Sequence, residues 1–241
     1  MNIKSLISSS IACLLLGGGV ALAQVKTTEL QFHYNFGKHL YKKELSGMTP
    51  VMSTLVHYSE DPWGANFILM DMGISGQGMD RMQTMAYRDL RFWDAPIALH
   101  LGYDGGLTNS ASFHNAITTG VDYVFKHSKY DFSLSTIVGY RHDFKDAKPH
   151  NIQVSSILGW TSWNRLWSIN NFLNVRSSNL GTEQSSLIFF MRPQLWLNIN
   201  QFVGMPDALN LSIGSEVRLQ YDTAISNKFY ALPSLAMKWT F

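Results

Sequence analysis

The sequence contains a single cysteine, Cys13, among its 241 residues. One thiol cannot form an intramolecular disulfide, so no disulfide framework holds this fold together. The fold must be closed by some other means.

Long apolar runs are also missing beyond the first 23 residues. No later stretch offers the roughly 18 consecutive apolar residues that mark a membrane-spanning helix, so helical spans are excluded there. Charge of one sign is missing too, since 19 Lys and Arg face 17 Asp and Glu. Without a basic stripe or an acidic tail, the chain has no electrostatic footprint for nucleic acid. Prolines are scattered and no Gly/Ser-rich or charged tract divides the chain, which favours one domain.

The first residues have the three parts of a secretory signal peptide. Lys4 precedes an apolar stretch over 11–22. An A-x-A site, Ala21-Leu22-Ala23, then comes directly before Gln24. This pattern predicts a signal peptide over 1–23 and a mature chain over 24–241. A membrane anchor is the alternative, but the apolar run is shorter than the roughly 20 residues of a span. A lipoprotein reading of Cys13 fails, because the leucines follow this cysteine rather than precede it.

The mature chain is rich in strict alternation of apolar and polar residues. In LNLSIGSEVRLQY (209–221), the apolar positions include Ile213 and Val217, and the polar positions include Glu216 and Arg218. Period two over this length predicts strands with one apolar and one polar face. We expect about twelve of them, at 28–37, 50–58, 63–73, 84–93, 96–104, 115–125, 129–141, 150–161, 164–176, 185–198, 208–221 and 228–241.

Two points in this assignment stay open. The second, third and fourth strands mix their faces, and AYRDLRFW (86–93) also reads as a short helix. The connection INQFVGMPD (199–207) is longer than its place among the short turns predicts.

A soluble sandwich would alternate as well, but three features favour a barrel in a membrane. Strands of about 10–14 residues exceed the usual 5–6 of globular sheets and fit a tilted bilayer crossing. Aromatic residues gather near strand ends, as interfacial girdles require. The connections alternate between tight turns (SEDP, DAP, KHS, SW) and longer polar loops (KHLYKKELSGM, ISGQGMDRMQ, GGLTNSASFHN, HDFKDAKPH). We therefore predict an all-β fold, a transmembrane antiparallel β-barrel of about twelve strands, with no loop long enough to plug it.

The last strand supports the same prediction. In ALPSLAMKWTF (231–241), Leu235, Met237, Trp239 and Phe241 share one face, which we expect to contact outer-membrane lipids. The strand resembles the C-terminal signature of bacterial outer-membrane proteins, with its final aromatic residue and apolar residues at every second position before it. That resemblance implies that Trp239 and Phe241 form an assembly signal for the barrel-assembly machinery. It also implies a location in the outer membrane of a Gram-negative bacterium.

If the apolar faces meet lipid, then the polar faces line a lumen. Such residues could be a structural network of ion pairs or a selectivity lining for a solute. A barrel of twelve strands is narrow, so small solutes would pass one at a time. The candidate lining and solute-binding residues are His33, His100, Asp104, Arg141, Arg192, Trp196, Glu216 and Arg218, within a wider inward set that adds Asp122, Asp131, Arg176, Gln194, Lys228, Tyr230 and Lys238.

Five segments resemble the Tsx-like group of outer-membrane proteins: LQFHYNFG, WGANFILMDM, AYRDLRFW, RPQLWLN and LPSLAMKWTF. The likeness follows the mature chain in order. It implies a twelve-stranded channel for the passive uptake of small polar solutes, with nucleosides as the expected class and no cofactor.

Two other classes of function stay open. Outer-membrane phospholipase barrels use a Ser, a His and an Asn on the outer wall, and FHN (113–115) and KHS (126–128) are the local hints here. A structural or adhesive barrel would be expected to have longer outer loops. No metal site is predicted, because no H-x-x-x-H or H-x-E spacing occurs.

Overall fold

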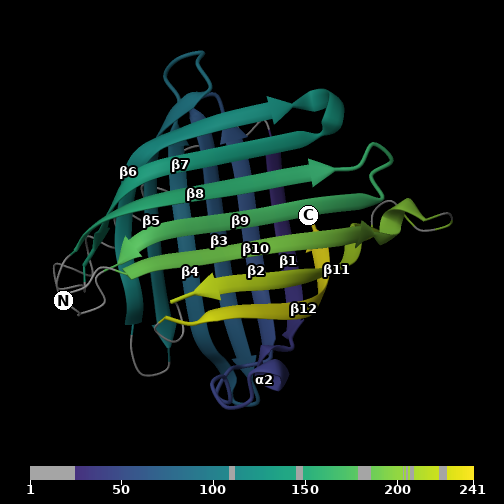
Figure 1. The fold of residues 1–241 in the computed structure, drawn as a ribbon. Helices are drawn as coiled ribbons and strands as arrows, with labels where there is room; N and C mark the ends of the chain where they lie inside the picture. Colours follow the sequence, from purple (N-terminus) through teal and green to yellow (C-terminus); the bar gives the residue numbers. More distant parts are fainter. Residues whose placement is uncertain are drawn as a thin grey trace.

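In a computed structural model of the protein, twelve antiparallel strands close into one barrel (Figure 1). Each strand pairs with its neighbours along the chain, and β1 pairs with β12. The structure describes residues 25–108, 112–144, 149–178, 186–202, 204, 206, 209–222 and 227–241. The predicted signal peptide over 1–23 lies outside this set. Within it, the predicted all-β barrel fold is confirmed.

The strands are β1 (Val25–Asn35), β2 (Val51–Asp61), β3 (Gly64–Ser75), β4 (Gly78–Leu90), β5 (Ile97–Thr108), β6 (Ser112–His127), β7 (Phe132–Asp143), β8 (His150–Thr161), β9 (Trp167–Ser178), β10 (Ser186–Asn198), β11 (Leu211–Tyr221) and β12 (Phe229–Thr240). Three short helical segments join them: α2 (Gly37–Leu40), η1 (Ser128–Tyr130) and η2 (Ile199–Gln201). No helix in the described part of the chain is long and apolar enough to cross a membrane.

The strands are strongly tilted. In Figure 1, β6 to β10 run across the front of the barrel while β1 to β5 run steeply behind them. Opposite walls of a closed sheet cross in this way because closure requires the strands to tilt against the barrel axis. Closure of the ring places strands that are far apart in sequence on opposite sides of one lumen.

The two ends of the barrel differ in their connections. At the short-turn end, the links from β2 to β3, β4 to β5, β6 to β7 and β8 to β9 have between two and six residues. The link from β10 to β11 is also at this end and, with twelve residues over 199–210, is the exception that the sequence pattern indicated. The described termini of the barrel, at Val25 and Phe241, lie at this end as well, because β1 begins and β12 finishes there. We call the opposite end the long-loop end after its longest link, the fifteen residues from β1 to β2, although the β3–β4 link there has only two residues.

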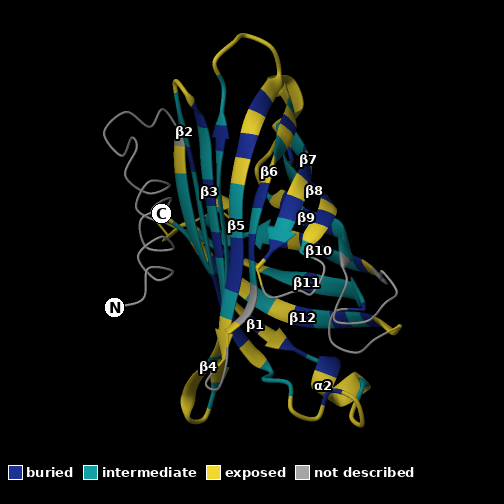
Figure 2. Cartoon of the chain, turned by 90° about the vertical axis from the view of Figure 1, so that its left-hand side faces the viewer, coloured by how far each residue is buried: buried dark blue, intermediate teal, exposed yellow. Residues whose placement is uncertain are grey.

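Burial alternates along the strands as the sequence pattern predicts (Figure 2). On β1, Gln31, His33 and Asn35 are buried inside the barrel while Phe32 and Tyr34 are exposed on the outside. An aromatic girdle surrounds the short-turn end, as expected at a membrane interface. Its exposed members are Trp63, Phe92, Trp93, Tyr130, Trp163, Trp167, Trp239 and Phe241.

The region over 74–93 differs from the prediction. ISGQGMDRMQ was expected to be a long loop, but Ser75 pairs with Gly78 and the link is a tight hairpin. Gly78 adopts a φ of 105°, which a residue with a side chain rarely tolerates. The helical reading of AYRDLRFW is also wrong, because Tyr87 pairs with Phe67 on β3 and with Gly102 on β5. In the same way GGLTNSASFHN is mostly strand, since β5 continues to Thr108 and β6 begins at Ser112.

The segment over 36–50, which we call the mouth segment, folds over the long-loop end. Leu45 packs against Tyr230 and Leu232 of β12, and the Tyr41 ring meets the Tyr230 ring edge-on at 4.9 Å. Glu44 pairs with Lys228 at 3.4 Å, and both its own backbone N–H and then Lys228 lower the pKa of Glu44. No loop was expected to fold inward. The mouth segment does so because Leu45 finds an apolar partner on the inner wall.

The terminal strand closes the barrel through its pairing with β1. Outward residues align across this junction, with Leu30 opposite Trp239 and Phe32 opposite Met237. The Phe241 N–H donates to the Thr28 carbonyl at 2.8 Å, and the Phe241 ring lies 4.7 Å from the Trp239 ring. The last residue is therefore held both by the backbone and by its ring.

The facing of β11 can be tested with two adjacent cysteine variants. Gln220→Cys should react with a membrane-impermeant thiol reagent, because Gln220 lines the lumen at the long-loop end. Leu219→Cys should be protected in a bilayer, because Leu219 pairs with the outward Met191 and Ala231. Labelling is measured in intact proteoliposomes, with the unsubstituted protein as the control. Equal labelling of the two variants would contradict the membrane barrel.

The closing strand generates a second prediction. Phe241→Asp should sharply reduce the amount of heat-modifiable barrel in outer membranes, because it places a charge in the aromatic girdle beside the closing junction. Thr240→Asp is a matched control, since Thr240 lies next to Phe241 but pairs with Glu29 on the opposite face. Normal assembly of Phe241→Asp would contradict the prediction.

Candidate functional site

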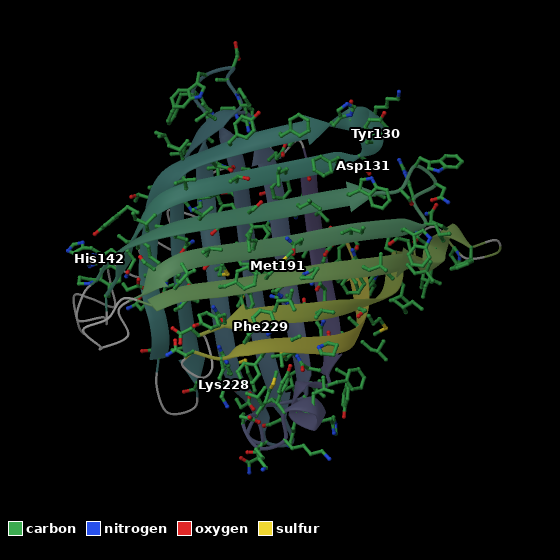
Figure 3. All side chains as sticks on the ribbon, in the orientation of Figure 1. Tyr130, Asp131, His142, Met191, Lys228 and Phe229 are labelled. Carbon is green, nitrogen blue, oxygen red and sulfur yellow. The ribbon has the colours of Figure 1, made fainter. Side chains whose placement is uncertain are left out.

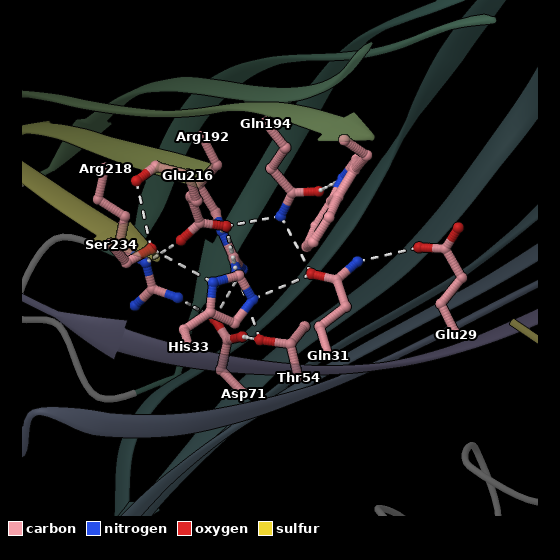
Figure 4. Close-up of polar contacts among 11 residues, drawn as sticks. Glu29, Gln31, His33, Thr54, Asp71, Arg192, Gln194, Glu216, Arg218 and Ser234 are labelled. Atoms are coloured by element: carbon pink, nitrogen blue, oxygen red, sulfur yellow. Dashed lines mark hydrogen bonds and ion pairs between the residues drawn. The ribbon is translucent and has the colours of Figure 1, made fainter. Parts of the chain in front are cut away.

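Polar side chains from opposite walls meet in the middle of the lumen (Figure 4). We call this group the central network, and its members are Gln31, His33, Thr54, Asp71, Arg192, Gln194, Glu216 and Arg218. They come from β1, β2, β3, β10 and β11.

Arg192 is the centre of this network and is almost fully buried. Its Nε donates to Glu216 Oε2 at 3.0 Å, and its Nη2 lies 2.9 Å from the same oxygen. Its Nη1 donates to Asp71 Oδ2 at 2.7 Å. Since Glu216 is on the adjacent strand β11 while Asp71 is on β3, one guanidinium joins two walls.

The bond between Arg192 and Asp71 crosses the lumen. β10 and β3 are five positions apart in the closed ring of twelve strands, which is close to opposite. Arg218 of β11 also reaches Asp71, at 3.3 Å, and binds Glu216 at 2.9 Å. Thr54 of β2 donates to the other oxygen of Asp71 at 2.5 Å. Two arginines and two carboxylates therefore form a balanced bridge between the walls.

Amide side chains extend the central network along β1 and β10. Gln194 donates to Glu216 at 2.6 Å and to Gln31 at 3.1 Å. His33 shares the same Gln31 oxygen at 3.1 Å. These bonds satisfy buried polar groups that would otherwise be costly to remove from water.

A second network joins β5, β7, β8 and β9 toward the long-loop end. Arg141 binds Asp104 at 3.0 Å and Asp143 at 2.8 Å. Arg176 reaches Asp104 at 3.3 Å although β9 and β5 are four positions apart in the ring. Gln153 accepts a hydrogen bond from Arg141 at 3.1 Å. Like the central network, this second network joins strands that are not neighbours.

Two cavities lie on either side of the central network. The one toward the long-loop end has a volume of about 540 Å³, and the one toward the short-turn end has about 250 Å³. Asp71 and Arg218 line the first, and Arg192 lines the second. The bond between Arg192 and Asp71 therefore lies on the boundary between the cavities.

Charge is nearly balanced in both cavities. The larger is lined by three arginines and four carboxylates, which are Arg81, Arg176, Arg218, Glu44, Asp71, Asp80 and Asp104. The smaller is lined by three basic and three acidic residues, which are Arg91, Lys126, Arg192, Glu29, Asp89 and Asp122. Neither lining favours a strongly charged solute of one sign.

Apolar and aromatic side chains lie beside these charges. Phe172 lines both cavities. In the smaller cavity the Phe67 and Tyr87 rings stack at 4.8 Å with an angle of 19° between their planes. The lumen thus offers flat apolar surfaces within reach of ionic groups.

The structure brings most of the predicted lining residues into networks. His33, Arg192, Glu216 and Arg218 belong to the central network, and Asp104 and Arg141 belong to the second. Five further residues that the sequence pattern predicted to point inward do so: Asp122, Arg176, Gln194, Tyr230 and Lys238. His100 lies apart from both networks and binds Asp89 at 2.8 Å.

Trp196 points inward but lines neither cavity. It is fully buried, its Nε1 donates to Gln194 at 3.2 Å, and Lys238 Nζ lies 4.9 Å above the ring. The ring lies against β11 at Gly214, where a Cβ atom would come within 2.6 Å of the indole. Glycine is required there by this close approach, and Trp196 is part of the wall.

Two residues of the predicted inward set lie elsewhere. Asp131 follows η1 in the β6–β7 turn, with a φ of 43°, and is exposed at the barrel end (Figure 3). Lys228 lies at the long-loop end, where it pairs with Glu44 (Figure 3). Both residues lie just before the first residue of a strand, β7 or β12. The alternation of a strand therefore does not fix the direction of their side chains.

Sequence reasoning missed Asp71, Thr54 and Phe172. Asp71 lies in β3, where the inward residues Phe67 and Leu69 are as apolar as their outward neighbours, so alternation could not assign a face. The available signal was that Asp71 is the only charged residue of β3, and a charge in a membrane strand must face the lumen.

Of the two local hints of an outer-wall enzyme, only KHS lies wholly within the described residues. The side chains of Phe113 and His114 lie outside the described residues, so FHN is not tested. In KHS, the His127 ring lies 4.7 Å from the Tyr130 ring in the girdle at the short-turn end. Among the described residues, no three His, Cys, Asp or Glu side chains gather in a way that could hold a metal ion.

The fold is similar to that of solved porins. The structure of the NanC porin superposes with a TM-score of 0.53 at 8% sequence identity, covering 88% of this chain and 98% of that one. The KdgM porin gives a TM-score of 0.49 at 9% identity, covering 89% of this chain and 99% of that one. At such low identity the first similarity shows a shared barrel fold alone. No curated protein matches the sequence.

Membership of a sequence family rests on separate grounds. The family described as a domain of unknown function, DUF5020, matches residues 27–241, which include almost the whole of β1 and every later strand. This chain therefore belongs to the DUF5020 family.

Proposed function

We propose that the protein is an outer-membrane channel for the passive uptake of small, uncharged polar solutes, with nucleosides as the favoured class. The observation that carries the proposal is the composition of the two cavities. Each combines nearly balanced charges with flat apolar surfaces inside one barrel.

The outer face supports the membrane part of the proposal. Exposed apolar residues cover the outside, and an aromatic girdle surrounds the short-turn end. Closure through β1 and β12 pairs backbone groups that lipid could not satisfy. The end strand, with Trp239 and Phe241 exposed, is the segment that we propose the barrel-assembly machinery recognises in a Gram-negative outer membrane.

The inner face supports the class of solute. A nucleoside offers an aromatic base, which could stack on Phe172 or on the Phe67 and Tyr87 pair. Its sugar hydroxyls could bond to arginines and carboxylates of the lining. A neutral solute also avoids the cost of removing a net charge from water in a narrow passage. Because Trp196 is packed in the wall, the stacking role passes to Phe172, and the relationship to the Tsx-like group stays a prediction.

The bore supports selectivity over general diffusion. The crossing bonds of Arg192 and Arg176 narrow the lumen of this twelve-stranded barrel, whereas the lumen of a larger porin is a water-filled channel. Solutes that pass must bind weakly enough to leave again.

The proposal predicts the rates at which solutes enter liposomes. Purified protein in liposomes should speed the entry of a nucleoside more than that of a neutral sugar of equal size. Entry is measured with labelled solutes, with protein-free liposomes as the blank. Equal rates would indicate a nonselective pore, and no entry of either solute would contradict a channel.

A matched pair of variants tests the stacking surface. Phe172→Leu should reduce the nucleoside preference several-fold while keeping the barrel folded, because it removes the ring that lines both cavities. Phe125→Leu makes the same substitution on the exposed outer face and should leave the preference unchanged. The ratio of nucleoside to sugar entry is the measurement. An unchanged ratio in Phe172→Leu would exclude this ring from recognition.

A further inference from the structure

We infer that Asp71 determines the bore of this lumen, because it is the carboxylate that holds Arg192 and Arg218 across the boundary between the two cavities. The inference rests on the proposed function in so far as the lumen conducts. It assigns to one residue the width of the passage at the boundary between the two cavities, whatever the identity of the solute.

The contacts of Arg192 are asymmetric between the two walls. Its bonds to Glu216, at 3.0 and 2.9 Å, run between adjacent strands and lie along one wall. Its bond to Asp71, at 2.7 Å, runs to β3 on the other side of the ring. Arg218 has the same asymmetry, with Glu216 at 2.9 Å on its own strand and Asp71 at 3.3 Å across the lumen.

Asp71 is fixed as an acceptor on its own wall. Thr54 of β2 lies directly opposite Asp71 in the strand register and donates to its Oδ1. This leaves Oδ2 for both arginines. The carboxylate thus serves as the anchor of the bridge on the β3 side.

Removing either carboxylate leaves both arginines with one carboxylate partner, and Arg192 Nη2 also keeps a longer hydrogen bond to Thr54 of β2, at 3.4 Å. Without Asp71, Arg192 and Arg218 keep Glu216, and their side chains can lie along the β10–β11 wall. Without Glu216, both arginines keep Asp71, and the bridge across the lumen persists. The two changes alter the charge of the bridge equally, but only the loss of Asp71 removes the ionic crossing. Arg192 then has to release only its 3.4 Å bond to Thr54 to lie along the β10–β11 wall.

The experiment compares Asp71→Ala with Glu216→Ala in planar bilayers. Asp71→Ala should raise the single-channel conductance in KCl several-fold over the unsubstituted protein, while Glu216→Ala should leave it close to the starting value. Both variants should shift the reversal potential in a KCl gradient toward anion selectivity, because each leaves two arginines with one carboxylate. Heat-modifiable migration on gels confirms that each barrel is folded.

Arg192→Gln provides an independent variant, because it breaks the same crossing from the other side. It should also raise the conductance several-fold, but with a shift toward cation selectivity, since Arg218 then faces two carboxylates. This opposite shift separates the loss of the crossing from a general loosening of the barrel. If Asp71→Ala fails to assemble, the conductance and selectivity of Arg192→Gln test the inference alone.

Three results would overturn the inference. These are an unchanged conductance in a folded Asp71→Ala or Arg192→Gln barrel, an equal rise in Glu216→Ala, and a rise with no shift in selectivity. Failure of the proposed solute class would look different. It would leave this conductance pattern intact while nucleoside and sugar enter liposomes at equal rates.

Discussion

Closure of the sheet is the constraint on which the rest of this structure depends. In lipid no water can satisfy a free backbone N–H or carbonyl, so a strand edge cannot be left open. The pairing of β1 with β12 removes that edge and reaches the last residue through Phe241. Closure in turn requires tilted strands, and it gives every strand one face toward lipid and one face toward the lumen. The apolar outer face and the polar inner face both follow from it.

Closure also explains why the interior carries charged residues of both signs that form ion pairs. An Arg or Lys on the lipid face costs about 2–4 kcal/mol at mid-depth, so the charges of the strands are directed inward. Inside a ring of twelve strands these groups are near one another and only partly hydrated, and each needs a partner. Arg192 meets this need on its own wall and across the lumen at once. A narrow barrel thereby acquires bridges that a wider barrel could not span.

The bridges have consequences for both the stability of the barrel and the shape of its lumen. They satisfy buried charges, and they also divide the lumen into two cavities. The apolar surfaces of Phe172, Phe67 and Tyr87 lie beside these charges because β3, β4 and β9 direct these aromatic residues into the lumen. The outcome is a lumen of mixed character, which is suited to a solute with a polar and an apolar side. A lumen lined only with charges would favour ions.

The sequence by itself determined the class of fold and the facing of the regular strands. Glu216 and Arg218 could be placed inside because the period of a strand is two, and this relation is local. The sequence did not determine the faces of β3, because Phe67 and Leu69 are as apolar as Ile68 and Met70, and it did not reveal the hairpin at Gly78. Only the tertiary structure decided that Asp71 meets Arg192, since β3 and β10 face each other through ring closure and tilt. Only the structure showed that the inward Trp196 lines neither cavity, because its ring lies against the bare backbone of Gly214 on the next strand. The contact of Arg192 with Asp71 joins residues 121 positions apart, and no local pattern encodes that these two will meet.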